Sequence, residues 1–296
     1  MMDLLYVDVF GNGAFTGNPL AVVKAEATLD ARQMQTVAAW LNLSETAFLL
    51  PPEDRLADYR VRIFTPRQEL SFAGHPSVGA AWAAIHWRLM PSEGGLRMQQ
   101  CGAGLLPVRV DDPSTHSRIH VKSPTARLQT TIAPQRLLEM TRTALGTPLV
   151  GQAQIVDVGA VWLLANLGQS NRVRALQPNL SAVASLTSEL GCVGIAVFGR
   201  ETLGAAALAV RAFCPGDGIA EDPVTGSANA AIGTLLHATG QLPGPRYEVS
   251  QGREIGRDGH VLVEVENDGT VWIGGACTTC IEGFLEYPTA PQRLTA

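Results

Sequence analysis

The sequence lacks an excess of basic residues and lacks any long apolar run. It has 22 Lys and Arg against 27 Asp and Glu, a formal net charge of -5 over 296 residues. A nucleic-acid interface neutralises phosphates with clustered Lys and Arg, and this balance argues against one. No apolar run approaches the roughly 18 residues that span a bilayer, and MMDLLYVDVF does not read as a secretion signal. We therefore expect a cytoplasmic protein that binds neither nucleic acid nor membrane.

The sequence is also poor in cysteine. Its five cysteines are an odd set without the spacing of a disulfide framework, so we expect reduced thiols. Cys277 and Cys280 form a lone C-x-x-C pair. A structural zinc site needs four ligands, and no second pair or nearby His completes this one. We therefore expect no metal site.

What the sequence does contain is an internal repeat. VRIFTP at 61–66 recurs as VRAFCP at 210–215, and VDV at 7–9 recurs at 156–158. Both matches have an offset of 149, from 61 to 210 and from 7 to 156. Ordered self-similarity of this kind indicates duplicated units related by a pseudo-two-fold axis.

A third repeated motif follows each V-R-x-F-x-P segment. GHPSVGAA at 74–81 resembles EDPVTGSA at 221–228, with an offset of 147 from His75 to Asp222. If the halves are duplicates, His75 and Asp222 occupy equivalent places and face one shared cleft. We predict a site there.

Residue patterning predicts similar elements in both halves. Helices are expected over 31–41, with Asp30 as N-cap, and over 78–89, 130–145 and 227–238. Strands are expected over 4–10, 20–24, 46–50, 59–64, 155–165, 193–198, 205–213, 246–250, 260–266 and 270–274. The predicted fold class is α+β, with strands wrapped around one apolar helix in each half. The predicted domains are 1–127, completed by a tail of about 282–296, and 128–281.

Each half places a Pro and a Gly near the start of its buried helix. The residues are Pro76 and Gly79, then Pro223 and Gly226. Helix starts offer unpaired N–H groups and the positive end of the macrodipole, so two converging starts would bind a carboxylate or a developing carbanion. The glycines would let a ligand approach closely. Helix capping and turn formation alone also favour Gly and Pro at these positions. A ligand site is favoured over this explanation because the pattern occurs in both halves.

Five segments resemble the signature blocks of the phenazine biosynthesis PhzF-like isomerase family. They are FTGNPLAVV at 15–23, NLSETAFL at 42–49, IFTPRQELSFAGHPSVGAAW at 63–82, CPGDGIAEDPVTGSANA at 214–230 and QGREIGRDG at 251–259. The resemblance covers nearly the whole chain and implies the diaminopimelate epimerase-like fold, two similar domains with the active site between them. It also implies a homodimeric, cofactor-independent enzyme that moves a proton on a small carboxylate.

The resemblance assigns the central acid or base to Glu45, with His75 and Asp222 as further catalytic residues. Glu45 also has a physical case, because a carboxyl just before an apolar strand can be desolvated in a closed cleft, which raises its pKa. His75 would relay a proton or donate to an oxyanion. Asp222 is expected at a helix start, where the dipole favours a carboxylate. The predicted substrate-binding residues are Ser44, Gly74, Thr225, Gly226 and Ser227, and Asn18 is expected to shape the cleft floor.

Cysteine chemistry separates two types of reaction. The resemblance implies that diaminopimelate epimerases and proline racemases carry paired cysteines where this chain has His75 and Asp222, so racemisation by two thiols is disfavoured. We therefore expect the alkylated protein to keep its activity. The chain departs from the family pattern at Ser71, where Pro is frequent, and at Asn229, where His is frequent. These changes speak against the phenazine precursor as the substrate.

Three functions stay open at this point. The leading one is an isomerase that shifts a proton between carbons of a small carboxylate, with Glu45 as the proton shuttle. The second is an epimerase or racemase that uses Glu45 opposite His75 or Asp222. The third is a non-catalytic small-molecule binding protein, because a fold alone does not establish activity.

Overall fold

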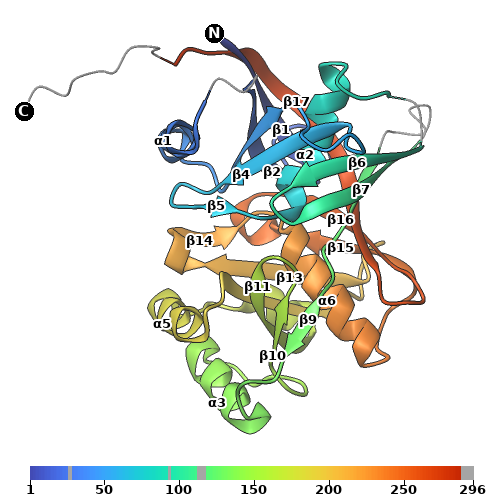
Figure 1. Ribbon diagram of the computed structural model, residues 1–296. Helices are drawn as coiled ribbons and strands as arrows, with labels where there is room; N and C mark the ends of the chain where they lie inside the picture. Colours follow the sequence, from blue (N-terminus) through green and yellow to red (C-terminus); the bar gives the residue numbers. More distant parts are fainter. Residues whose placement is uncertain (26–28, 93–94, 112–117, 288–296) are drawn as a thin grey trace, which may run out of the picture.

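The computed structural model describes residues 1–25, 29–92, 95–111 and 118–287. Figure 1 shows two halves stacked one above the other, each a curved sheet with a helix against its inner face. The first half contains β1 (Met2–Val9), β2 (Asn18–Lys24), α1 (Ala31–Leu41), β3 (Thr46–Leu50), β4 (Tyr59–Phe64), β5 (Glu69–Leu70), α2 (Gly74–His86), β6 (Gly95–Cys101), β7 (Gly104–Val110) and β8 (Arg118–Lys122).

The second half repeats this order. After β9 (Arg127–Gln129) and α3 (Pro134–Leu145) come β10 (Gln154–Asp157), β11 (Val161–Gln169), α4 (Ser170–Ala175), α5 (Leu180–Leu190), β12 (Gly194–Arg200), β13 (Leu208–Cys214), the short helix η2 (Pro215–Asp217), β14 (Ile219–Asp222), α6 (Gly226–Ala238), β15 (Arg246–Gln251), η3 (Arg253–Ile255), β16 (Gly259–Val265) and β17 (Val271–Leu285).

Strand pairing confirms the duplication. In the first half β2 is parallel to β3, β3 is antiparallel to β4, and β4 is parallel to β6. In the second half β11 is parallel to β12, β12 is antiparallel to β13, and β13 is parallel to β15. The same alternation of parallel and antiparallel pairs in the same order is what a pseudo-two-fold repeat requires.

The two halves exchange strands at their junction. The first residues of β17 pair with β16 and β8, and its later residues pair with β1, from Val9 opposite Cys277 to Met2 opposite Leu285. β9, at the start of the second half, pairs with β10 of the same half. Residues 288–296 of the predicted tail lie outside the described residues, and the division into domains 1–127 and 128–281 stays a prediction.

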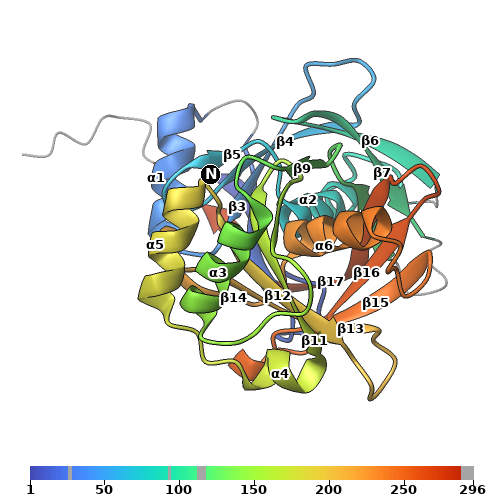
Figure 2. The same cartoon turned by 90° about the horizontal axis from the view of Figure 1, so that it is seen from below.

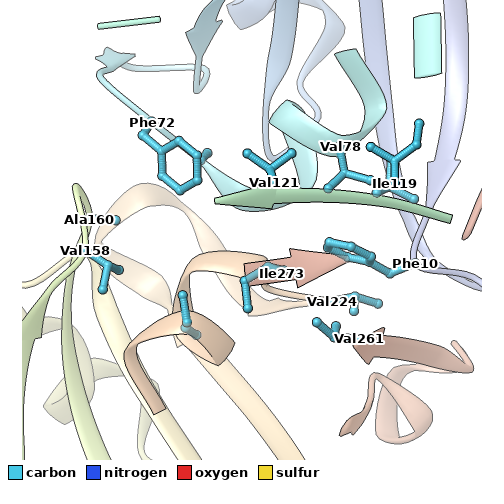
Figure 3. Close-up of a cluster of buried hydrophobic side chains, with 14 of the residues drawn as sticks. Phe10, Phe72, Val78, Ile119, Val121, Val158, Ala160, Val224, Val261 and Ile273 are labelled. Carbon is cyan, nitrogen blue, oxygen red and sulfur yellow. The ribbon is translucent and has the colours of Figure 1, made fainter. Parts of the chain in front are cut away.

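The central helices are buried on most of their surface. Ten of the 13 residues of α2 and nine of the 13 residues of α6 are buried, which is typical of a helix enclosed by other elements rather than lying on a surface. One hydrophobic cluster runs through both halves. Figure 3 shows part of it, with Phe72 from the first half near Val158 and Ala160 from the second. The halves therefore share a core.

Several predicted elements have different bounds. α2 begins at Gly74, not at 78, so Pro76 and Gly79 lie inside the helix rather than before it. Pro76 is tolerated there because the first turn of a helix has no intrahelical partners for its N–H groups. A Cβ on Gly79 would lie 2.5 Å from Leu20 Cδ2, so this glycine serves the packing of α2 on β2 and not the approach of a ligand.

The strand predicted over 155–165 is wrong as a single strand. β10 and β11 form a hairpin around Gly159, which has a φ of 88° and donates its N–H to Asp157 Oδ1 at 2.9 Å. The strand predicted over 270–274 continues to Leu285, because Gly274 and Gly275 lie within the strand and not in a turn. A Cβ on Gly274 would lie 2.1 Å from the His120 ring, so close packing explains the glycine.

No helix among the described residues is both long enough and apolar enough to cross a membrane.

Candidate active site

Helices α2 and α6 meet at their N-terminal ends. Figure 2 shows the two helices adjacent, near the middle of the molecule. A Cβ on Gly74 would lie 2.7 Å from the Gly226 Cα, and a Cβ on Gly226 would lie 2.9 Å from the Gly74 Cα. Only glycines allow this approach. The unpaired first-turn N–H groups of both helices, and the positive ends of both dipoles, are therefore brought together at the junction of the halves.

A cleft opens beside this contact, between the two halves. Its walls are formed by Glu45, Thr65, Leu70, Ala73, Gly74, His75, Ala160, Trp162, Val193, Cys214, Asp217, Ile219, Asp222, Thr225, Gly226 and Ser227. Every predicted site residue except Ser44 lies in this wall. Ser44 lies just behind it, where its hydroxyl donates to Asn18 Oδ1 at 3.2 Å.

Glu45 and His75 face each other within the cleft. Glu45 directly precedes β3 and His75 is the second residue of α2. His75 Nε2 lies 3.5 Å from Glu45 Oε2, and the side chains are 3% and 16% exposed. Both atoms are buried without a hydrogen-bond partner. Buried polar atoms are nearly always paired, so unpaired ones in a cleft indicate groups that a ligand completes.

Burial shifts the protonation of this pair in opposite directions. It raises the pKa of Glu45 to about 8, and the nearby charges of Asp222 and Asp217 also raise it. It lowers the pKa of His75 to about 3. At neutral pH the pair is therefore a carboxylic acid beside a neutral imidazole, and a carboxyl with a pKa near the working pH suits proton transfer.

Asn18 fixes the orientation of the His75 ring. Its Nδ2 donates to Asp222 Oδ1 and to the Val224 carbonyl, each at 2.9 Å, which identifies this atom as the amide nitrogen. The same nitrogen lies 3.4 Å from His75 Nδ1. Both hydrogens of this nitrogen are already donated and it cannot accept one, so a hydrogen on Nδ1 would have no partner in Asn18. We therefore place the ring hydrogen on Nε2, which faces Glu45.

Asp222 lies opposite, on the second half of the chain. Its Oδ1 accepts from Asn18 at 2.9 Å and its Oδ2 accepts from the Thr225 hydroxyl at 2.5 Å. Burial raises the pKa of Asp222 to about 6, and these two hydrogen bonds lower it. The carboxyl is thus mostly ionised at neutral pH, with both oxygens held.

A buried amide supports Asp222 from behind. Gln251 Nε2 donates to the Thr225 hydroxyl at 2.8 Å and to the Asp222 carbonyl at 3.1 Å. The Thr225 hydroxyl therefore accepts from Gln251 and must turn its own hydrogen toward Asp222. Asn229, where the family resemblance favours His, donates to Gln251 Oε1 at 3.1 Å. Asn229 thus belongs to the support of the site rather than to the cleft wall.

The sequence did not indicate the roles of three side chains at the site. Asn18 was expected only in the cleft floor, yet it links Ser44, His75 and Asp222. Trp162 and Asp217 carry no prediction. Trp162 Nε1 donates to Ser227 Oγ at 3.0 Å, and Asp217 lines the cleft. No sequence spacing indicates that these residues meet.

The predicted equivalence of His75 and Asp222 is wrong. α2 and α6 have 13 residues each and begin at Gly74 and Gly226, an offset of 152 that matches His75 with Ser227. Asp222 ends β14 and is not at a helix start. The segments at 74–81 and 221–228 each contain a Pro, and aligning the two prolines gives the offset of 147. The contact of Gly74 with Gly226 instead shows which residues of the two helices are equivalent. His75 and Asp222 nevertheless line one cleft.

Cys214 also lines the cleft, although it is only 7% exposed. Burial raises the pKa of its thiol well above the usual range, and the charges of Asp222, Asp217 and Glu45 raise it further. Because the thiolate is the reactive form, we expect iodoacetamide at pH 7 to leave Cys214 unmodified and the activity intact. Peptide mass spectrometry after timed alkylation tests this. Rapid labelling of Cys214 with parallel loss of activity would contradict it.

In the described part of the chain no group of three or more His, Cys, Asp or Glu side chains is placed to hold a metal ion.

Comparison with known proteins gives consistent results. The family model of phenazine biosynthesis-like proteins, PhzC-PhzF, matches residues 7–283. Antisense-enhancing sequence 1 of Schizosaccharomyces pombe is 33% identical, covering 94% of this chain and 96% of that protein. The uncharacterized isomerase YddE of Escherichia coli K12 is 32% identical over 89% of this chain and 90% of its own. A crystal structure of a Bacillus anthracis phenazine biosynthesis protein of the PhzF family has a TM-score of 0.81 at 23% identity, covering 97% and 99% of the two chains.

Proposed function

The chain belongs to the family of phenazine biosynthesis-like proteins, and we propose that it is an isomerase that moves a proton between carbons of a small carboxylate. Relatives in the family carry the name isomerase, which supports the reaction class. Glu45 carries the proton, and no step needs a metal or another cofactor. The proposal includes a homodimer, which light scattering on the purified protein tests.

One observation carries the proposal. Glu45 and His75 form a buried pair 3.5 Å apart whose facing atoms have no partner. Leaving two such atoms unpaired is costly, and no other described residue forms a hydrogen bond with either. A substrate that exchanges a proton with Glu45 and accepts a hydrogen bond from His75 Nε2 would satisfy both.

The proposed reaction assigns one role to each of these groups. The substrate carboxylate lies against the N–H groups at the starts of α2 and α6. Ionised Glu45 removes a proton from a neighbouring carbon, and the negative charge spreads onto the carboxylate oxygens, where preorganised N–H groups stabilise it. The substrate must therefore hold a carbon–carbon double bond next to the carbon that loses the proton, so that the negative charge also reaches the far carbon of that bond. Glu45 then returns the proton to this far carbon on the same face, and the double bond moves by one position. His75 Nε2–H orients the substrate beside it.

The alternative is an epimerase with Asp222 as the second acid or base. The Asp222 oxygens already accept hydrogen bonds from Asn18 and Thr225. This carboxylate is therefore better suited to keeping those side chains in place than to exchanging a proton with the substrate. The two reactions differ in stereochemistry. An epimerase run in D2O inverts the exchanging carbon, whereas a shift on one face by Glu45 does not.

The pH dependence of proton exchange tests the order of the steps. Because the pKa of Glu45 is raised to about 8 and Glu45 acts first as a base, kcat/KM should rise from pH 7 and level off above pH 8. Asp222 is mostly ionised over this range. A profile that falls between pH 7 and 9 would show instead that the enzyme needs Glu45 protonated at the start.

A further inference from the structure

The cleft is acidic for a site that binds a carboxylate. Its wall contains three carboxyl side chains, those of Glu45, Asp217 and Asp222, and no Lys or Arg among the described residues that line it. The helix starts attract one anionic group, but the surrounding carboxyls repel further negative charge. A ligand with a carboxylate and nothing cationic is therefore a poor match to the whole cleft.

The three carboxyls differ in what they can offer a ligand. Glu45 is largely neutral at pH 7, since burial raises its pKa to about 8. Asp222 uses both oxygens to accept from Asn18 and Thr225. Asp217 has no hydrogen bond and no ion pair with another described residue. Of the three, only Asp217 offers an ionised carboxylate whose oxygens accept no hydrogen bond from a described residue.

Asp217 lies at the mouth of the cleft. It is the last residue of η2, and it is half-buried between the exposed residues Gly216 and Gly218. Gly74, His75 and Gly226, by contrast, are fully buried. A ligand whose carboxylate lies at the helix starts would therefore direct its other end toward Asp217.

Arg67 holds the loop that carries Asp217. It comes from the other half, between β4 and β5, and its Nη1 donates to the Gly216 carbonyl. Its guanidinium makes no ion pair with Asp217 within 4 Å, but its charge lowers the pKa of the Asp217 carboxyl, which burial raises. Arg67 therefore favours the ionised form of Asp217 while leaving its oxygens free.

A second observation shows that the cleft is built for a ligand. His75 is 3% exposed, lines the cleft and has no partner for Nε2. The cleft wall also includes the apolar side chains of Leu70 and Ile219, which suit a short run of methylene groups.

We propose that the ligand has a cationic end as well as a carboxylate, and that Asp217 is the residue that selects it. This inference rests on the proposed function for the position of the carboxylate. The ligand class is a small acid with a basic side chain, whose ammonium group lies against Asp217. Asp217 thereby determines specificity without taking part in the proton transfer.

Binding of matched probes tests the proposal. L-Ornithine and L-norvaline share a five-carbon chain and differ in the terminal ammonium group, and L-glutamate carries a negative group instead. By isothermal titration calorimetry at pH 7 we expect ornithine to bind at least about tenfold more tightly than norvaline, with glutamate weakest. In Asp217→Asn the ratio of the ornithine and norvaline Kd values should fall to about one. Asp3→Asn, which removes a surface charge outside the cleft, should keep the wild-type ratio.

The two proposals fail in different ways. Equal Kd values in the wild type, no measurable binding of ornithine, or a ratio that survives Asp217→Asn would each overturn the role of Asp217. Glu45→Gln should keep the ratio of Kd values. If ornithine binds with the expected preference and the wild type exchanges no proton on it or on other small acids, the proton-transfer proposal fails and the Asp217 inference stands.

Discussion

Glu45→Gln is expected to lower the rate of proton exchange by about 100-fold to 10,000-fold, the usual contribution of general acid–base catalysis. Gln has nearly the same shape as Glu but cannot take up or release a proton near neutral pH. The variant should therefore lose the rate while keeping the fold and the binding of small acids. Exchange is measured by 1H NMR in D2O over a panel of small amino and hydroxy acids.

The matched control is Glu282→Gln. Glu282 lies on β17 with its side chain 63% exposed and its Oε1 3.1 Å from His86 Nε2. Its replacement therefore removes a carboxylate outside the cleft and should leave exchange unchanged. Equal exchange rates in wild type and Glu45→Gln would remove Glu45 from the mechanism and transfer the role to His75 or Asp222. Unchanged thermal unfolding of the variant shows that any loss of rate is not a loss of fold.

Gly226→Ala is expected to damage both stability and activity. The added Cβ would lie 2.9 Å from the Gly74 Cα and 3.0 Å from the His75 N, and these backbone atoms cannot move aside as a flexible side chain would. Overpacking of this kind costs about 1–3 kcal/mol of unfolding free energy. It also pushes apart the two helix starts, and a displacement of about 1 Å at a catalytic site can reduce the rate about 100-fold.

Gly283→Ala is the control for this substitution. Gly283 lies in β17, and no atom of the described residues lies within 4 Å of the position of its Cβ, so Ala there should be neutral or slightly stabilising. Urea unfolding and the exchange assay report the two effects separately. If Gly226→Ala and Gly283→Ala unfold at the same urea concentration and exchange protons at the same rate, the helix contact does not support the site.

Local patterns predict the elements that one segment determines. The bounds of α1 are as expected, because Asp30 forms a capping box with Gln33 and apolar residues recur at helical spacing. The bounds of β3 and β4 also match the prediction. Pro51 and Pro52 end β3, and the alternation of apolar and polar residues marks β4. The raised pKa of Glu45 was expected from its place just before an apolar strand.

Features that depend on contacts between distant segments were not predictable. The register of the two halves follows from the contact of Gly74 with Gly226, and a comparison of short motifs instead matched His75 with Asp222. The length of β17 depends on its pairing with β1 and β8, whereas the predicted strand ended at residue 274. Asp217, the last residue of η2, becomes part of the site only because the fold brings it to the cleft wall beside residues of the first half.

The protonation of Glu45 in the free protein tests the central claim most directly, because it needs no substrate. The carboxyl carbon of Glu45, labelled with 13C and assigned by its absence in Glu45→Gln, can be followed by NMR from pH 4 to pH 10. The account predicts a midpoint near 8, where burial in the cleft places the pKa. A midpoint near 4.5, the ordinary value for Glu, would show a solvated carboxylate and contradict its role as the proton carrier.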